Sequence, residues 1–119
     1  MAGTITASET TIGSVRQIVF SWLTDGSGDA TATATGKEYS GDLIKVLYVP
    51  GTTTPSNLYD ITLTDGDSYD LLAGQGTDCP NGSTLVITGG LLPVATSAIS
   101  LTVANGGAIK TGKVVIYLR

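Results

Sequence analysis

The chain contains no histidine, and this absence removes several kinds of chemistry at once. Histidine is the usual general base near neutral pH, the commonest metal ligand, and a member of most Ser-His and Cys-His catalytic pairs. The single cysteine, Cys79, cannot form an internal disulfide and has no histidine to activate its thiol. We therefore interpret Cys79 as a small buried hydrophobe and expect the chain to carry no catalytic residue.

Charge is scarce as well, and acidic residues outnumber basic ones. Six basic against ten acidic residues give a net charge of −4, and charged residues make up 13% of the 119, against about 25% in typical soluble domains. Lys and Arg do not cluster, so we expect no nucleic-acid partner. A surface so poor in charge suits a chain that hides much of itself against other proteins.

Long apolar runs are also missing. The sequence has no stretch of about 18 consecutive apolar residues of the kind that crosses a membrane as a helix. Its start, MAGTITASET, has no basic segment followed by an apolar run. These features predict a soluble protein without a membrane partner, kept inside the cell or released with an assembly that forms there.

Short β-branched runs dominate the chain and are separated by Gly, Asp, Asn and Pro. This pattern predicts an all-β fold, namely a single-domain β-sandwich or small Greek-key barrel of about seven or eight strands. We expect residues 14–119 to form this domain and residues 1–13 to form an N-terminal arm or an extra edge strand. The strands are predicted at 15–23, 31–36, 41–51, 58–64, 83–90, 98–107 and 111–119.

Period-two alternation predicts which side chains of these strands face the core. In VRQIVFSWL, Ile18, Phe20 and Trp22 share one face, and in GDLIKVLYVPG, Ile44, Val46 and Tyr48 share one face. The same alternation groups Tyr59, Ile61 and Leu63; Ile99, Leu101 and Val103; and Val114, Ile116 and Leu118.

Connections between the strands are predicted from turn residues. TDGSGD, residues 24–29, is expected to close a hairpin between 15–23 and 31–36, and Asn105-Gly106-Gly107 is expected to form a tight turn. DLLAGQGTDCPNGS predicts a long ordered loop that packs its leucines, with one helical turn near Tyr69 to Leu72.

Aspartates gather in one region of the sequence and form a candidate site. The aspartates that lie close together in the sequence are Asp60, Asp65, Asp67, Asp70 and Asp78. A carboxylate pair can hydrolyse a glycoside, but aspartate is also a preferred turn residue because it bonds its own backbone. The spacing Asp65, Asp67 and Asp70 does not follow the calcium-loop order, and Gly74-Gln75-Gly76 lacks the lysine of a phosphate cradle. We predict turns here, with no catalytic residue, metal or cofactor.

Two segments, LYDITLTDGDSYDLLAGQG and ISLTVANGGAIKTGKVVIYLR, resemble the second half of small virion structural proteins of tailed bacteriophages, of the type that decorates or cements the capsid. The resemblance covers residues 15–119 and lies in the succession of strands and turns. It implies a β-rich, often trimeric protein that binds the major capsid protein or other virion subunits where they meet and stabilises the shell. It also implies assembly in the host cytoplasm and location in the virion, and it supplies no site residues.

The sequence itself suggests where such a protein would touch its partners. The last strand is apolar on both faces, and the first dozen residues have only weak alternation and no anchor of their own. The candidate contact residues are Ala2, Thr4, Ile5, Ile12, Val115 and Tyr117.

Two other functions remain open at this point. One is a tail-tube, tail-terminator or baseplate component of a phage, which differs from a decoration protein in the symmetry of its partners. The other is a carbohydrate- or receptor-binding sandwich that stacks sugars on Tyr39 and Tyr69, the two tyrosines expected in loops.

Overall fold

Nine antiparallel strands form the fold in a computed structural model, which describes residues 3–34, 38–56, 58–66, 69–77, 79 and 82–119. No helix occurs within these ranges, and the predicted all-β class is confirmed. The strands are β1 (Thr4–Ile12), β2 (Val15–Leu23), β3 (Ala30–Ala34), β4 (Tyr39–Pro50), β5 (Asp60–Thr64), β6 (Leu85–Ile87), β7 (Pro93–Ser97), β8 (Ser100–Ala104) and β9 (Thr111–Leu118).

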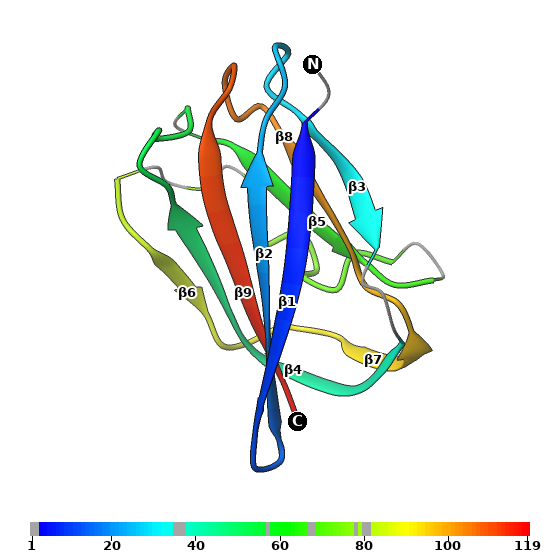
Figure 1. The fold of residues 1–119 in the computed structure, drawn as a ribbon. Helices are drawn as coiled ribbons and strands as arrows, with labels where there is room; N and C mark the ends of the chain where they lie inside the picture. Colours follow the sequence, from blue (N-terminus) through cyan, green and yellow to red (C-terminus); the bar gives the residue numbers. More distant parts are fainter. Residues whose placement is uncertain (1–2, 35–37, 57, 67–68, 78, 80–81) are drawn as a thin grey trace.

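The strands build two sheets that pack face to face as a β-sandwich (Figure 1). The larger sheet has the order β1-β2-β9-β4-β6, and β7 pairs with the first half of β4. The smaller sheet has the order β3-β8-β5. The count exceeds the predicted seven or eight because β7 begins at Pro93, which lacks a backbone donor and interrupts the pattern of a strand.

The core lies between the sheets and is filled by alternate side chains of both. The predicted inward triplets of β2, β5, β8 and β9 are confirmed, since each of these side chains is at most 3% exposed. The ring centroids of Trp22 and Tyr59 lie 5.7 Å apart with an interplanar angle of 49°, joining the larger sheet to the segment that leads into the smaller one. Alternation therefore fixes which face of each sheet is buried.

The predicted hairpin of the second and third strands is wrong. β2 belongs to the larger sheet and β3 to the smaller, so residues 24–29 cross between the sheets. The buried Thr24 hydroxyl donates to the carbonyl of Gly107 at 2.6 Å and accepts from the amide of Lys110 at 2.8 Å. Thr24 thereby ties this crossing to the connection from β8 to β9, which also passes between sheets.

The predicted inward face of β4 is wrong at Ile44. A bulge shifts the register against β9 between Leu43 and Lys45, so Leu43 turns inward with 6% exposure and Ile44 is half-buried. Beyond the bulge, Val46 and Tyr48 are fully buried as predicted. An inserted residue reverses the alternation, and simple period-two counting cannot register it.

The long loop after β5 packs its leucines as predicted, with Leu71 and Leu72 at most 1% exposed. The predicted helical turn near Tyr69 to Leu72 is wrong. Instead, the amide of Ala73 donates to the carbonyl of Asp70, and the amide of Gln75 to that of Leu72, each at 3.0 Å. Ala73 has a positive φ of 52°, so the backbone makes successive tight turns.

Three polar atoms of the core have no hydrogen-bond partner in the described part of the chain. They are the hydroxyls of Tyr48 and Tyr59 and the indole Nε1 of Trp22. Burial raises the pKa of both tyrosines well above 10.0, and the neighbouring Cys79 adds to the shift in each. The folded state therefore holds these phenols neutral.

We expect the buried Tyr48 and Tyr59 to make the folded protein less stable at alkaline pH. Because the folded pKa of Tyr48 and Tyr59 is raised, their contribution to stability is fully present below pH 10.0 and is lost as the pH rises above it. Urea unfolding midpoints measured at increasing pH should fall for the wild type and fall less for Tyr48→Phe.

Because the Tyr48 hydroxyl has no hydrogen-bond partner in the described part of the chain, a second prediction concerns the stability of Tyr48→Phe at neutral pH. At neutral pH, Tyr48→Phe should change the free energy of unfolding by no more than about 1 kcal/mol, because no hydrogen bond is lost. Tyr69→Phe, at a side chain that is 67% exposed, is the control and should match the wild type at every pH. A pH dependence identical in Tyr48→Phe and the wild type would contradict the assignment.

Candidate functional site

The outer face of the larger sheet carries a row of aliphatic side chains, and this row is the centre of the candidate site. Pairing sets Val19 of β2 beside Val115 of β9, Val115 beside Leu47 of β4, and Leu47 beside Val86 of β6. We call these four residues the outer apolar row. Each belongs to the alternation opposite to the core, so the row faces away from the smaller sheet.

Exposure varies along the outer apolar row. Val86 is 51% exposed, Val19 and Leu47 are half-buried, and Val115 is 7% exposed. Val115 does not belong to the core cluster between the sheets. Its low exposure is instead consistent with its place in the middle of the row, between Val19 and Leu47. The result is a continuous aliphatic strip across four strands.

The charges nearest the outer apolar row are basic. Lys45 and Lys113 lie two residues from Leu47 and Val115 on the same side of their strands, whereas the exposed Asp42, which alternates with the buried Leu43, lies farther along β4. A partner that presents apolar groups together with carboxylates complements such a face.

Tyr117 adds an aromatic side chain to the same face. Its hydroxyl accepts a hydrogen bond from Nε2 of Gln17 at 3.0 Å, and Nζ of Lys45 lies 4.5 Å from its ring centroid. Both contacts come from the neighbouring strands. They hold the ring in place before any partner binds, which lowers the entropy lost on binding.

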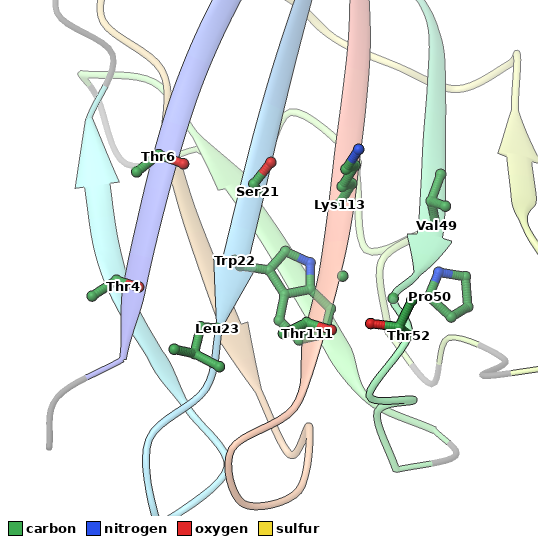
Figure 2. Close-up of a pocket in the computed structure, with 12 residues that line it drawn as sticks. Thr4, Thr6, Ser21, Trp22, Leu23, Val49, Pro50, Thr52, Thr111 and Lys113 are labelled. Carbon is green, nitrogen blue, oxygen red and sulfur yellow. The ribbon is translucent and has the colours of Figure 1, made fainter.

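A hollow of about 580 Å³ opens at the end of this face, where the last residues of β2 and β4 lie beside the first residues of β9 (Figure 2). Figure 2 shows the indole of Trp22 reaching from β2 toward β9, with Lys113 and several hydroxyl side chains around it. A Cβ at Gly112 would overlap this indole, so the glycine makes room for the ring. The lining residues are Thr4, Thr6, Ser21, Trp22, Leu23, Val49, Pro50, Gly51, Thr52, Thr111, Gly112 and Lys113.

The hollow combines an apolar floor with a hydroxyl-rich rim. Leu23, Val49 and Pro50 supply aliphatic surface, and Lys113 supplies a cation. This composition suits a protruding side chain of another protein, because pockets that fix a partner combine apolar surface with a few polar groups.

The candidate residues from the sequence fall in different places. Thr4 lines the hollow, and Val115 and Tyr117 lie on the outer face. Ile5 is 7% exposed within the chain's own core, so we leave it out of the contact surface. Ile12 is the last residue of β1, and Ala2 lies outside the described residues.

Sequence reasoning did not select Val19, Leu47 or Val86 as contact residues. The signal for the first two was present, because both segments 15–23 and 41–51 are apolar on the face opposite to the core. What the sequence does not show is that β9 lies between β2 and β4, which places their outward residues in one row.

The acidic corner is occupied by backbone hydrogen bonds. The Asp70 carboxylate accepts from the amides of Leu63, Leu72 and Gly74 at 3.4, 3.1 and 2.9 Å. Asp65 accepts from the amide of Tyr69 at 3.3 Å. Asp67 and Asp78 lie outside the described residues, and within the described part no three metal-ligating side chains gather.

Asp25, in the turn that follows β2, also accepts hydrogen bonds from backbone amides. Asp25 accepts from the amides of Ser27 and Asp29 at 2.8 and 3.1 Å, and these bonds lower the pKa of its carboxyl. The aspartates of both turns therefore serve the backbone.

The two tyrosines of the carbohydrate alternative differ in their surroundings. Tyr39 is 5% exposed, its hydroxyl donates to Glu9 at 3.2 Å, and burial together with this carboxylate raises its pKa. Tyr69 is 67% exposed. The structure thus leaves one of the pair in a position to stack on a sugar.

We expect Asp70→Ala to destabilise the fold, because three backbone amides lose their acceptor. The loss should be about 1–3 kcal/mol in the free energy of unfolding, measured by urea titration. The control is Asp29→Ala, because the exposed Asp29 carboxylate accepts no backbone hydrogen bond within the described residues; this variant should leave the midpoint unchanged. Equal losses in the two variants would show that Asp70 has no special structural role.

Gly112→Ala should also destabilise the protein, because the new methyl group overlaps the Trp22 indole. Overpacking of this kind costs about 1–3 kcal/mol. Trp22 is the single tryptophan, so its fluorescence reports the displacement directly as a red-shifted emission. Gly82→Ala is the matched control, since a Cβ there meets nothing within 4 Å. Unchanged emission and stability in Gly112→Ala would rule out the close packing.

Three comparisons with known proteins were made. No protein-family model, no curated protein and no solved structure matches this chain. Over the described residues, no helix has the length and apolar character needed to span a membrane. The function is therefore argued from the surface of the molecule.

Proposed function

We propose that this chain is a non-enzymatic structural protein of a virus particle, a capsid decoration or cement protein that binds where shell subunits meet. In this proposal the outer face of the larger sheet is the attachment surface. The resemblance of two segments to phage decoration proteins supports the class of function, and the outer apolar row supports the location of the contact.

The single observation that carries the proposal is the outer apolar row. Val19, Val115, Leu47 and Val86 form an aliphatic strip that the chain's own core does not cover. On the smaller sheet, the outward positions of β5 and β8 include Thr62, Ser100 and Thr102 and form no such row. A continuous apolar strip across neighbouring strands favours a protein contact over free exposure to water.

The stabilising action follows from mass action. A protein that binds the assembled shell and not its free subunits adds its binding free energy to the assembled state. No chemical step is needed. The work is done by burying the outer apolar row and by filling the hollow beside Trp22 with a partner side chain, as well-packed pockets at interfaces contribute most of the binding energy.

The charge of the face refines the expected partner. Lys45 and Lys113 flank the apolar strip, so a shell surface with carboxylates around an apolar centre fits best. Attachment of this kind weakens as salt rises, because rim charges are screened over about 10 Å at 0.1 M ionic strength.

A second candidate function has one observation in its favour. Tyr69 is 67% exposed in the loop after β5, where a sugar could stack on it. A carbohydrate-binding module predicts glycan-array binding that is lost in Tyr69→Ala, whereas the decoration proposal predicts that this variant attaches to shells normally.

The test is co-sedimentation of the purified chain with empty shells prepared from the virus whose genome encodes it. Leu47→Asp should weaken binding at least about tenfold, because a carboxylate would be buried in the apolar contact. Thr62→Asp places the same charge on the outer face of the smaller sheet and should bind like the wild type. Both variants should first be shown to be folded by circular dichroism.

Each outcome decides the proposal. Failure of the wild type to bind shells overturns the decoration function, and equal binding by Leu47→Asp overturns the assigned face. Electron microscopy of the same particles separates the nearest alternative, because a tail-tube, tail-terminator or baseplate component would lie on the tail and not on the shell.

A further inference from the structure

Strand β1 forms one edge of the larger sheet, and one side of it is open (Figure 1). All nine residues of β1 pair with β2 in a continuous register from Thr4 to Ile12. No strand of the described chain pairs with its other side. β3 of the smaller sheet lies close to part of β1, and a Cβ on Gly3, just before β1, would lie 2.8 Å from Cα of Ala30, but no ladder forms between the two strands.

β1 carries few of the devices by which proteins protect sheet edges. Its sequence, TITASETTI, contains no proline and no lysine, its register has no bulge, and its one charge is Glu9, which lies on the core side opposite Ile18 and accepts a hydrogen bond from Tyr39. The opposite edge is different. It is split between β6, which has three residues, and β7, which begins with Pro93 and has an irregular register.

We propose that β1 pairs with β1 of a second copy of this chain, antiparallel and across a two-fold axis at Ser8. The two larger sheets then join into one continuous sheet. Backbone groups along the open side of each strand bond to the other copy, which is the general mode of strand addition at a sheet edge. This dimer does not depend on the proposed function.

The sequence of β1 suits pairing with itself in this register. Ser8 lies opposite Ser8, Thr6 opposite Thr10, and Glu9 opposite Ala7. Cross-strand threonine pairs are favourable, and like charges directly opposite are not. A two-fold axis at Glu9 would set two carboxylates face to face, so the axis at Ser8 is preferred.

The same register continues the outer face from one copy to the next. Ser8 lies beside Val19, the first residue of the outer apolar row. An axis at Ser8 therefore brings the two rows end to end on one face. Stacking of two copies through this face is the alternative dimer, and the cross-linking test at Thr6 and Thr10 below distinguishes it from edge pairing.

The first test is the mass in solution, by sedimentation equilibrium over a range of concentrations. The expected result is a species of about twice the 12.1 kDa chain mass. The resemblance to decoration proteins implies a trimer, so mass separates the two. A monomer at every concentration, or a trimer, overturns the proposal.

The second test fixes the register by a disulfide. Opposite residues of antiparallel strands have Cα atoms about 4.5–5.5 Å apart, within the range that a disulfide spans. Ser8→Cys should therefore cross-link to itself under mild oxidation, while the native Cys79 is buried and does not compete. Thr6→Cys is the matched control and should cross-link only when mixed with Thr10→Cys. Cross-linking of Thr6→Cys alone, or none in Ser8→Cys, overturns the register.

The third test places like charges and then opposite charges at Ser8, on the proposed two-fold axis. Ser8→Lys and Ser8→Glu should each be monomeric, because like charges meet at the axis, and an equal mixture should restore the dimer. Restored association shows that both variants are folded. Thr84→Lys, near the opposite edge of the sheet, should remain dimeric. A Ser8→Lys protein that stays dimeric overturns the proposal.

Discussion

The contact between the two sheets at Trp22 and Tyr59 is the constraint on which the rest of the structure depends. The rings lie 5.7 Å apart, and neither side chain is more than 3% exposed. The Trp22 indole fills the space that a Cβ at position 112 would need, so glycine fits there. Once Trp22 points inward, alternation directs Leu23 and Ser21 outward, and the same holds along the other paired strands except where a bulge shifts the register, as in β4. The buried aromatics therefore determine which residues remain for the surface.

This constraint explains why an apolar strip lies outside. The larger sheet has more strands than the smaller one that covers it, and its central strands β2, β9 and β4 are apolar on both faces. The inward set fills the core, and the chain has no third layer to bury the outward set. Val115 is shielded by its row neighbours, yet the row itself is left to water or to a partner. Continuous apolar surface of this kind is a feature of interaction sites.

Local alternation predicts much of the fold, because each strand must bury one face. It identifies the inward residues of β2, β5, β8 and β9 correctly. It fails at Ile44, because a bulge is an insertion in one strand relative to another and has no local signature. It also fails for the connection after β2, because turn residues at 24–29 specify a bend but not which sheet receives the next strand. The hollow and the outer apolar row depend on strand order, which sequence alone does not supply.

The two proposals meet at Ser8, where the outer face reaches the open edge. Val19 lies beside Ser8 in the sheet, so pairing of two copies would extend one contact surface and not create a separate one. If the proposed function holds, a dimer with two aligned apolar rows would bind a repetitive shell with both halves, and the second contact would form at the high effective concentration set by the first. Edge pairing through β1 would leave the outer face free, so both apolar rows and the lysines beside them would stay available to a partner that carries carboxylates.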